Sequence, residues 1–220
     1  MKVEIWIPEH LSEITLGQYQ KFEKLNTDEN KESAFLLQKM VEIFCKLNLQ
    51  DVLQIKVKSL NGVVAHLNNI FEKEYPLVNK FSLHGVEYGF IPVLDDMTLG
   101  EYIDLDSSLN DWQDMHKAMS ILYRPIKFQK RNKYQVQDYK GIENAEVFKE
   151  MPLDITFGAM VFFWSLKNEL LVNILNYLQK GTRSKLTFHQ QEILEQSGVG
   201  ISQSMDLLKA MLPSLIRLPN

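Results

Sequence analysis

The chain has 220 residues and a mass of 25.7 kDa, which is enough for one large domain or two smaller ones. Hydrophobic residues make up 45% and charged residues 24% of the sequence, so an intrinsically disordered chain is excluded. The 24 Lys and Arg residues are outnumbered by 28 Asp and Glu residues. The resulting net charge of −4 argues against a dedicated nucleic-acid coat protein.

The cysteine content and the apolar runs indicate the compartment. Cys45 is the only cysteine, which excludes an internal disulfide and a cysteine-based zinc cage and fits a reducing compartment. The start of the chain has no apolar core of a secretory signal. The longest apolar run, residues 157–166, is shorter than the roughly 20 residues of a bilayer span. We expect an intracellular protein without membrane contact.

The first part of the chain predicts a short strand followed by helices. Apolar and polar residues alternate over 3–7, as in a strand. Thr15 and Gln18 form a capping-box pattern that opens a helix, and Ser33 precedes an amphipathic one. A helical turn capped by Asp51 and an amphipathic helix over 60–74 follow.

The middle of the chain changes to a β-hairpin. Strand-like residues 81–83 and 86–91 flank His84-Gly85, with glycine where a positive φ is needed. Thr98 and Glu101 then form a second capping box that opens a helix toward Leu109.

A helix capped by Asp111 comes next and ends before Pro125. Residues 126–150 are predicted to be irregular, with at most a short strand at 134–136.

The last part predicts helices alone. The longest begins at Asp154 or Thr156 and runs to about Gln179, and two shorter ones follow Thr187 and Ser202. The fold class is therefore mainly α (α+β): a helical bundle with a short N-terminal strand and a central β-hairpin. We expect lobes at 1–79 and 80–220, or one continuous domain.

One six-residue pattern occurs twice, 83 residues apart. Ile14-Thr15-Leu16-Gly17-Gln18-Tyr19 recurs as Met97-Thr98-Leu99-Gly100-Glu101-Tyr102. Capping chemistry explains the Thr and the Gln or Glu, but it does not require the shared Leu, Gly and Tyr. Two interpretations stay open: capping chemistry used twice, or a duplicated unit with a shared docking role.

The motifs of enzymes and metal sites are incomplete. A calcium-loop pattern begins at Asp104, but Leu109 and Met115 replace the required glycine and glutamate. The five histidines lack zinc-ligand spacing, and Gly198-Val199-Gly200 lacks the third glycine of a dinucleotide loop. The sequence therefore predicts no metal, no cofactor and no catalytic residue.

Charge is segregated along the chain. Residues 95–114 are rich in Asp and Glu and contain no Lys or Arg, whereas basic residues dominate 124–133. We interpret the two stretches as an interaction surface that pairs with a neighbouring subunit or partner. Its predicted residues are Asp104, Asp106, Asp111, Arg124, Lys127, Lys130 and Arg131.

Aromatic residues give the basic stretch a second interpretation. Tyr123, Phe128, Tyr134 and Tyr139 are interleaved with its cations, a pattern that can stack on single-stranded nucleic acid. No recognised nucleic-acid-binding motif accompanies the stretch, so a charged surface is favoured.

The start of the long helix is apolar on all its faces. Such a helix must be covered on every side, by its own domain or by a partner. Phe162, Phe163 and Trp164 therefore join the predicted interaction residues.

Several segments resemble known proteins. They are 81–92, with Phe-x-Leu-x-Gly-x-x-Tyr-x-Phe-Ile-Pro; 97–105, with Met-Thr-Leu-Gly-Glu-Tyr-Ile-Asp-Leu; 119–126; and the helix from Pro152 with its Phe162-Phe163 pair. These resemble tail and baseplate-hub assembly proteins of tailed bacteriophages, both contractile-tailed and crAss-like. The resemblance covers mainly residues 81–178 and, more loosely, the first 80. It carries no residue roles.

The resemblance implies a non-enzymatic phage morphogenesis protein. It would be a minor virion component or an assembly chaperone, located in the host cytoplasm or the virion. Its expected partners are other tail or baseplate proteins, or further copies of itself. The alternative is a phage nucleic-acid-binding protein that uses residues 124–140, and a small enzyme comes third.

Overall fold

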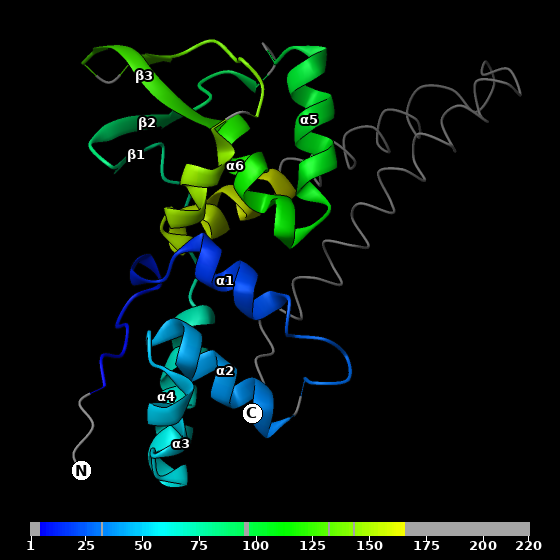
Figure 1. Cartoon of the computed structure of the whole chain (residues 1–220). Coiled ribbons are helices and arrows are strands. Elements are labelled where there is room, and N and C mark those ends of the chain that lie inside the picture. Colours follow the sequence, from blue (N-terminus) through cyan, green and yellow to red (C-terminus); the bar gives the residue numbers. More distant parts are fainter. Residues whose placement is uncertain (1–4, 32, 95–96, 132, 143, 166–220) are drawn as a thin grey trace, which may run out of the picture.

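The computed structural model describes residues 5–31, 33–94, 97–131, 133–142 and 144–165 (Figure 1). The fold is α+β and mainly helical. Small helices occupy one end of the molecule, a sheet with two further helices occupies the other, and α1 lies between them (Figure 1). The helices at the first end are α2 (Ala34–Phe44), α3 (Leu49–Leu53) and α4 (Val57–Phe71), and α1 spans Leu16–Glu23.

The predicted helix starts in this part are mostly confirmed. Thr15 Oγ1 accepts from the Gln18 backbone N–H at 3.2 Å, and Gln18 Oε1 accepts from the Thr15 N–H at 3.0 Å. Ser33 caps α2. The cap of α3 is Asn48 rather than Asp51, whose own N–H donates to the Asn48 side chain. Described residues 5–7 form no strand; Ile5 and Ile7 pack against the core, and Trp6 is exposed.

The predicted hairpin is confirmed as β1 (Lys80–Leu83) and β2 (Val86–Phe90). His84 and Gly85 both have positive φ, 50° and 76°, as a two-residue turn of this hand requires.

The sheet is larger than predicted. The basic stretch, expected to be irregular, forms β3 (Tyr123–Lys130). The short strand expected at 134–136 is present as part of β4 (Lys133–Val136). The strand order is β1-β2-β3-β4, antiparallel throughout.

A change of partner along β3 accommodates its proline. Residues 123–125 pair with β2, and residues from Ile126 onward pair with β4 after an irregularity. Pro125 has no N–H to donate, and its carbonyl accepts from the Gln137 N–H at 2.9 Å. Arg131, at φ 55°, begins the turn into β4.

Three elements connect the sheet to the rest of the chain. They are α5 (Leu99–Leu109), α6 (Met115–Leu122) and the 3-10 helix η4 (Ala145–Glu150). Thr98 and Glu101 form the predicted capping box at α5. Asp111 caps the 3-10 helix η3 (Trp112–Asp114), which leads into α6.

The last described helix spans 153–165. It begins one residue before the predicted Asp154. The rest of the predicted long helix and the helices expected after Thr187 and Ser202 lie outside the described residues. Gly158 allows the helix to approach the carbonyl of Pro76, because a Cβ on Gly158 would overlap that backbone.

One hydrophobic cluster runs through the described chain. It draws fully buried residues from both sides of the expected boundary at residue 79, including Phe22, Phe44, Met119 and Tyr123. Cys45 is buried in it as well. No described helix is both long and apolar enough to cross a membrane.

Candidate interaction surface

The acidic and basic stretches meet within one chain. Arg124 Nη1 on β3 lies 2.6 Å from Glu101 Oε1 on α5, and their side chains are only 13% and 5% exposed. Arg124, predicted to face a partner, therefore forms an ion pair within the chain, and this pair connects α5 to the sheet.

Hydrogen bonds keep Glu101 ionised despite its burial. Burial raises the pKa of Glu101, but hydrogen bonds from the backbone and hydroxyl of Thr98 and the charge of Arg124 outweigh it, so its pKa is lowered. One carboxylate thus caps α5 and holds the guanidinium.

Other charges of the two stretches are also used internally. The Tyr139 hydroxyl donates to Asp104 Oδ2 at 2.6 Å, and Lys127 Nζ lies 3.3 Å from Asp138 Oδ1. Asp111 Oδ1 accepts from the Gln113 N–H at the start of η3. The carboxylate of Asp106 has no ion-pair or hydrogen-bond partner in the described part of the chain.

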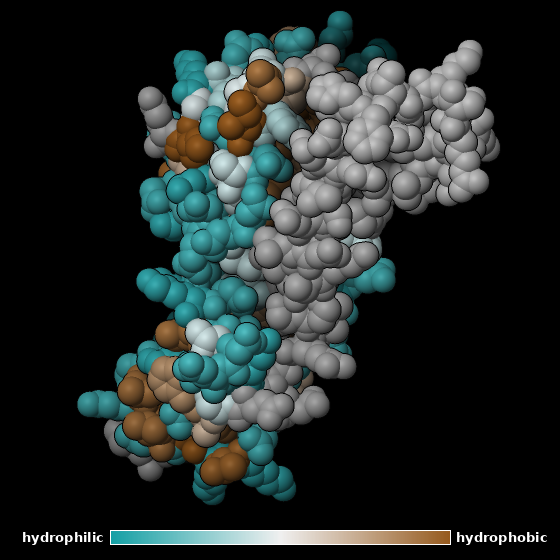
Figure 2. Space-filling model, turned by 90° about the vertical axis from the view of Figure 1, so that its right-hand side faces the viewer, coloured by the Kyte–Doolittle hydropathy of each residue, from teal (hydrophilic) through white to brown (hydrophobic). Residues whose placement is uncertain are grey.

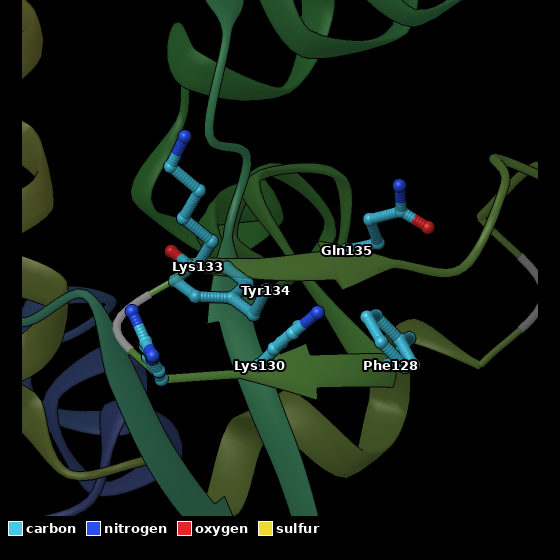
Figure 3. A pocket seen from close by; sticks show the side chains of 6 residues that line it. Phe128, Lys130, Lys133, Tyr134 and Gln135 are labelled. Atoms are coloured by element: carbon cyan, nitrogen blue, oxygen red, sulfur yellow. The ribbon is translucent and has the colours of Figure 1, made fainter.

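Lys130 and Arg131 lie at the tip of the β3–β4 hairpin. Both are exposed, and among the described residues neither has an ion-pair partner. A hollow of about 850 Å³ opens there between side chains of the two strands (Figure 3). It is lined by Phe128, Lys130, Arg131, Lys133, Tyr134 and Gln135.

The structure uses most of the aromatic rings of this stretch inside the fold. Tyr123 is fully buried and donates to the Val78 carbonyl at 2.8 Å. Tyr134 covers Gly89 of β2, and Tyr139 is bound to Asp104. Phe128 alone of the four is an exposed ring. Tyr134 and Tyr139 are half-buried, and Tyr134 lines the hollow together with Phe128.

The aromatic residues of the last described helix pack against the sheet. Phe162 and Phe163 lie 5.6 and 6.4 Å from Phe90 of β2, measured between ring centroids. Trp164 is half-buried, and its indole Nε1 has no acceptor among the described residues. Phe162 and Phe163 thus cover the domain's own sheet.

Sequence reasoning missed an exposed apolar face on α5. Leu99, Tyr102 and Ile103 follow one side of the helix and are 75%, 57% and 56% exposed. Figure 2 shows hydrophobic side chains gathered near the upper end of the molecule, at the level of α5 in Figure 1. We call these three residues the outer face of α5. The sequence carried a usable signal, because at helical periodicity these three residues fall on a different side of the helix from the buried residues Leu105 and Ser108.

His116 forms the main buried polar contact outside this surface. Its Nδ1 lies 3.1 Å from Gln20 Nε2, and its Nε2 lies 3.2 Å from Glu146 Oε1. Gln20 Nε2 also donates to the carbonyls of Trp112 and Gln113, at 2.7 and 3.1 Å. Burial, and next the charge of Lys149, lower the pKa of His116. The arrangement joins α1, α6 and η4.

The described residues include no group of three or more His, Cys, Asp or Glu placed to hold a metal ion. The chain matches no protein-family model, no curated protein and no solved structure.

Proposed function

We propose that this chain is a non-enzymatic morphogenesis protein of a tailed bacteriophage, acting by protein–protein contact in tail or baseplate-hub assembly. The observation that supports contact as its mode of action is the outer face of α5. Large apolar side chains gathered on a charged surface are typical of binding sites. The phage setting rests on the resemblance of residues 81–178.

The surroundings of this face suit a contact with a defined orientation. Apolar residues would supply affinity, and nearby charges would set the approach of the partner. Asp106 lies on the same helix as this face, three residues after Ile103. Most other charges predicted for the surface are occupied within the chain.

An amber mutant of the encoding phage, with the stop codon in the gene for this chain, tests the proposal. On a non-suppressing host we expect electron microscopy to find particles without complete tails, and a suppressing host to restore them. Mass spectrometry of purified wild-type particles then separates the two forms of the role. The chain should be found in the particles if it is a virion component and should be missing from them if it is a chaperone. Normal infectious particles without suppression would refute an assembly role.

Nucleic-acid binding by residues 124–140 is the second candidate, supported by the hollow at the hairpin tip. Its lining combines the exposed ring of Phe128 with the cations of Lys130, Arg131 and Lys133. A mobility shift with single-stranded DNA at low and high salt tests it. Binding that weakens with salt and is lost in Lys130→Glu/Arg131→Glu would support this candidate. The same affinity in that variant would exclude the hairpin tip.

A further inference from the structure

The two copies of the repeated pattern have opposite environments. Leu16 and Tyr19 of the first copy are 0% and 2% exposed, whereas their counterparts Leu99 and Tyr102 are 75% and 57% exposed. Both copies form the same capping box at the start of a helix. The local structure is therefore shared, and the copies differ in what covers them.

Residues 149–153 of the same chain, which join the end of η4 to the start of the last described helix, lie over the start of the first copy. The rings of Phe71, Trp112 and Phe157 pack against Tyr19. The Leu16 N–H donates to the Met151 carbonyl and the Leu153 N–H donates to the Ile14 carbonyl, both at 2.9 Å. Pro152 lies opposite Thr15 between these two bonds, where its missing N–H costs nothing.

Glycine at the third position of the first copy permits this close approach. A Cβ on Gly17 would lie 3.0 Å from the Lys149 carbonyl oxygen and 3.2 Å from the Lys149 Cβ. A larger side chain at position 17 would therefore push the covering segment away.

The second copy presents the same groups without a cover. Nothing lies within 4 Å of a Cβ placed on Gly100. In the described part of the chain, no backbone group bonds to the Leu99 N–H or the Met97 carbonyl, the counterparts of the two groups that bind residues 151 and 153. The start of α5 thus presents, uncovered, the backbone groups and the glycine that are occupied in the first copy.

We propose that the outer face of α5 binds a segment of a partner protein in which a proline separates two apolar residues, as in Met151-Pro152-Leu153. The segment pairs its backbone with residues 97–99 and lays its chain over Gly100. This deepens the assembly role proposed above and rests on it. A separate protein is favoured over a second copy, because Met151 and Leu153 are fully buried in their own chain.

A peptide titration tests this site. The probe is a fluorescent, end-capped peptide of residues 147–153, which has one Lys and one Glu and is neutral. We expect saturable binding to the wild-type protein by fluorescence anisotropy, weakened at least tenfold by Gly100→Gln. Gly62→Gln is the matched control, because Gly62 also lies in a helix with open space around it, and it should bind within twofold of wild type. A Leu153→Asn probe should bind at least tenfold more weakly.

Other outcomes would overturn the proposal. One is the absence of saturable binding. The other is equal binding to wild type and Gly100→Gln while circular dichroism shows that both proteins are folded. Equal binding would place the peptide elsewhere, for example on the first copy. A dimer by sedimentation that Gly100→Gln dissociates would identify a second copy as the occupant. An assembly defect in the amber phage together with any of these results would retain the assembly role and reject this site.

Discussion

At the residue scale, buried polar groups are matched to partners from distant parts of the chain. Glu101 meets Arg124, 23 residues away, and Gln20 meets His116, 96 residues away. Unpaired buried polar groups are costly, so each pair fixes how two elements meet. The sequence shows the residue types but not the pairing. Arg124 was therefore expected at an interface, although it lies inside the fold.

The Glu101–Arg124 pair should make the free energy of unfolding depend on pH. Glu101→Gln should lower the free energy of unfolding by about 2 kcal/mol at pH 7, because Arg124 loses its charged partner. The pKa of Glu101 is lowered on folding, so its contribution is complete above the ordinary value of 4.5 and is lost as the pH falls through the lowered value. Urea titrations at pH 7 and pH 3 check this: the difference between the two proteins should shrink at pH 3.

Cys45 should be unreactive in the folded protein. Burial raises the pKa of its thiol from 9.0 to about 11, and these two units lower the thiolate fraction about a hundredfold. We expect 5,5′-dithiobis(2-nitrobenzoic acid) at pH 8 to react at least that much more slowly with the folded protein than with the guanidinium-unfolded chain. Equal rates would show that Cys45 is accessible.

At the element scale, the sequence predicts the elements that neighbouring residues determine better than those that depend on contacts between distant residues. The two capping boxes and the His84-Gly85 hairpin were predictable, because the residues that form each lie within a few positions. Strand β3 was missed, because its stretch is charged and contains Pro125, whereas β4 contains the short strand expected at 134–136. What secures them is the packing of Tyr134 over Gly89, a contact across 45 positions that no local pattern reveals.

Removing the cap of α5 should cost a modest amount of stability. Thr98→Ala deletes the hydroxyl that accepts from the Glu101 N–H, and we expect a loss of about 1 kcal/mol. The midpoint of chemical denaturation measures it. An unchanged midpoint would mean that the Thr98 hydroxyl contributes no stability. Thr98→Ser, which keeps the hydroxyl, serves as the control.

Substitution of Gly89 should loosen the β3–β4 hairpin. A Cβ there would lie 2.8 Å from Tyr134 Cδ2 and 3.1 Å from Ile126 Cγ1, so the ring must move away from the carbonyls of Asn79 and Phe90 to which its hydroxyl donates. We expect Gly89→Ala to destabilise the protein by about 2 kcal/mol. Hydrogen exchange should show lower protection at β4 than in wild type. Full protection there would indicate that the ring adapts in place.

At the scale of the whole molecule, the chain closes on itself where residues 14–16 pair with residues 151–153. This junction connects α1 to η4 and to the helix 153–165, and it places Tyr19 within 5.6 Å of Phe157 between ring centroids. The repeated pattern drew attention to both copies. Sequence could not show which copy is covered, because burial depends on a segment more than 130 positions away from the first copy.

The two repeat glycines should therefore respond in opposite directions to the same change. Gly17→Ala brings a Cβ to 3.0 Å from the Lys149 carbonyl and should destabilise the protein by about 1 kcal/mol, because the backbone at the junction must shift. Gly100→Ala enters open space in a helix and should stabilise it by about 0.5–1 kcal/mol, as alanine favours the helix. Urea unfolding of both variants beside Gly62→Ala measures this contrast. A Gly17→Ala protein as stable as Gly100→Ala would mean that the junction tolerates a side chain, and that the covered copy is no guide to what the exposed copy binds.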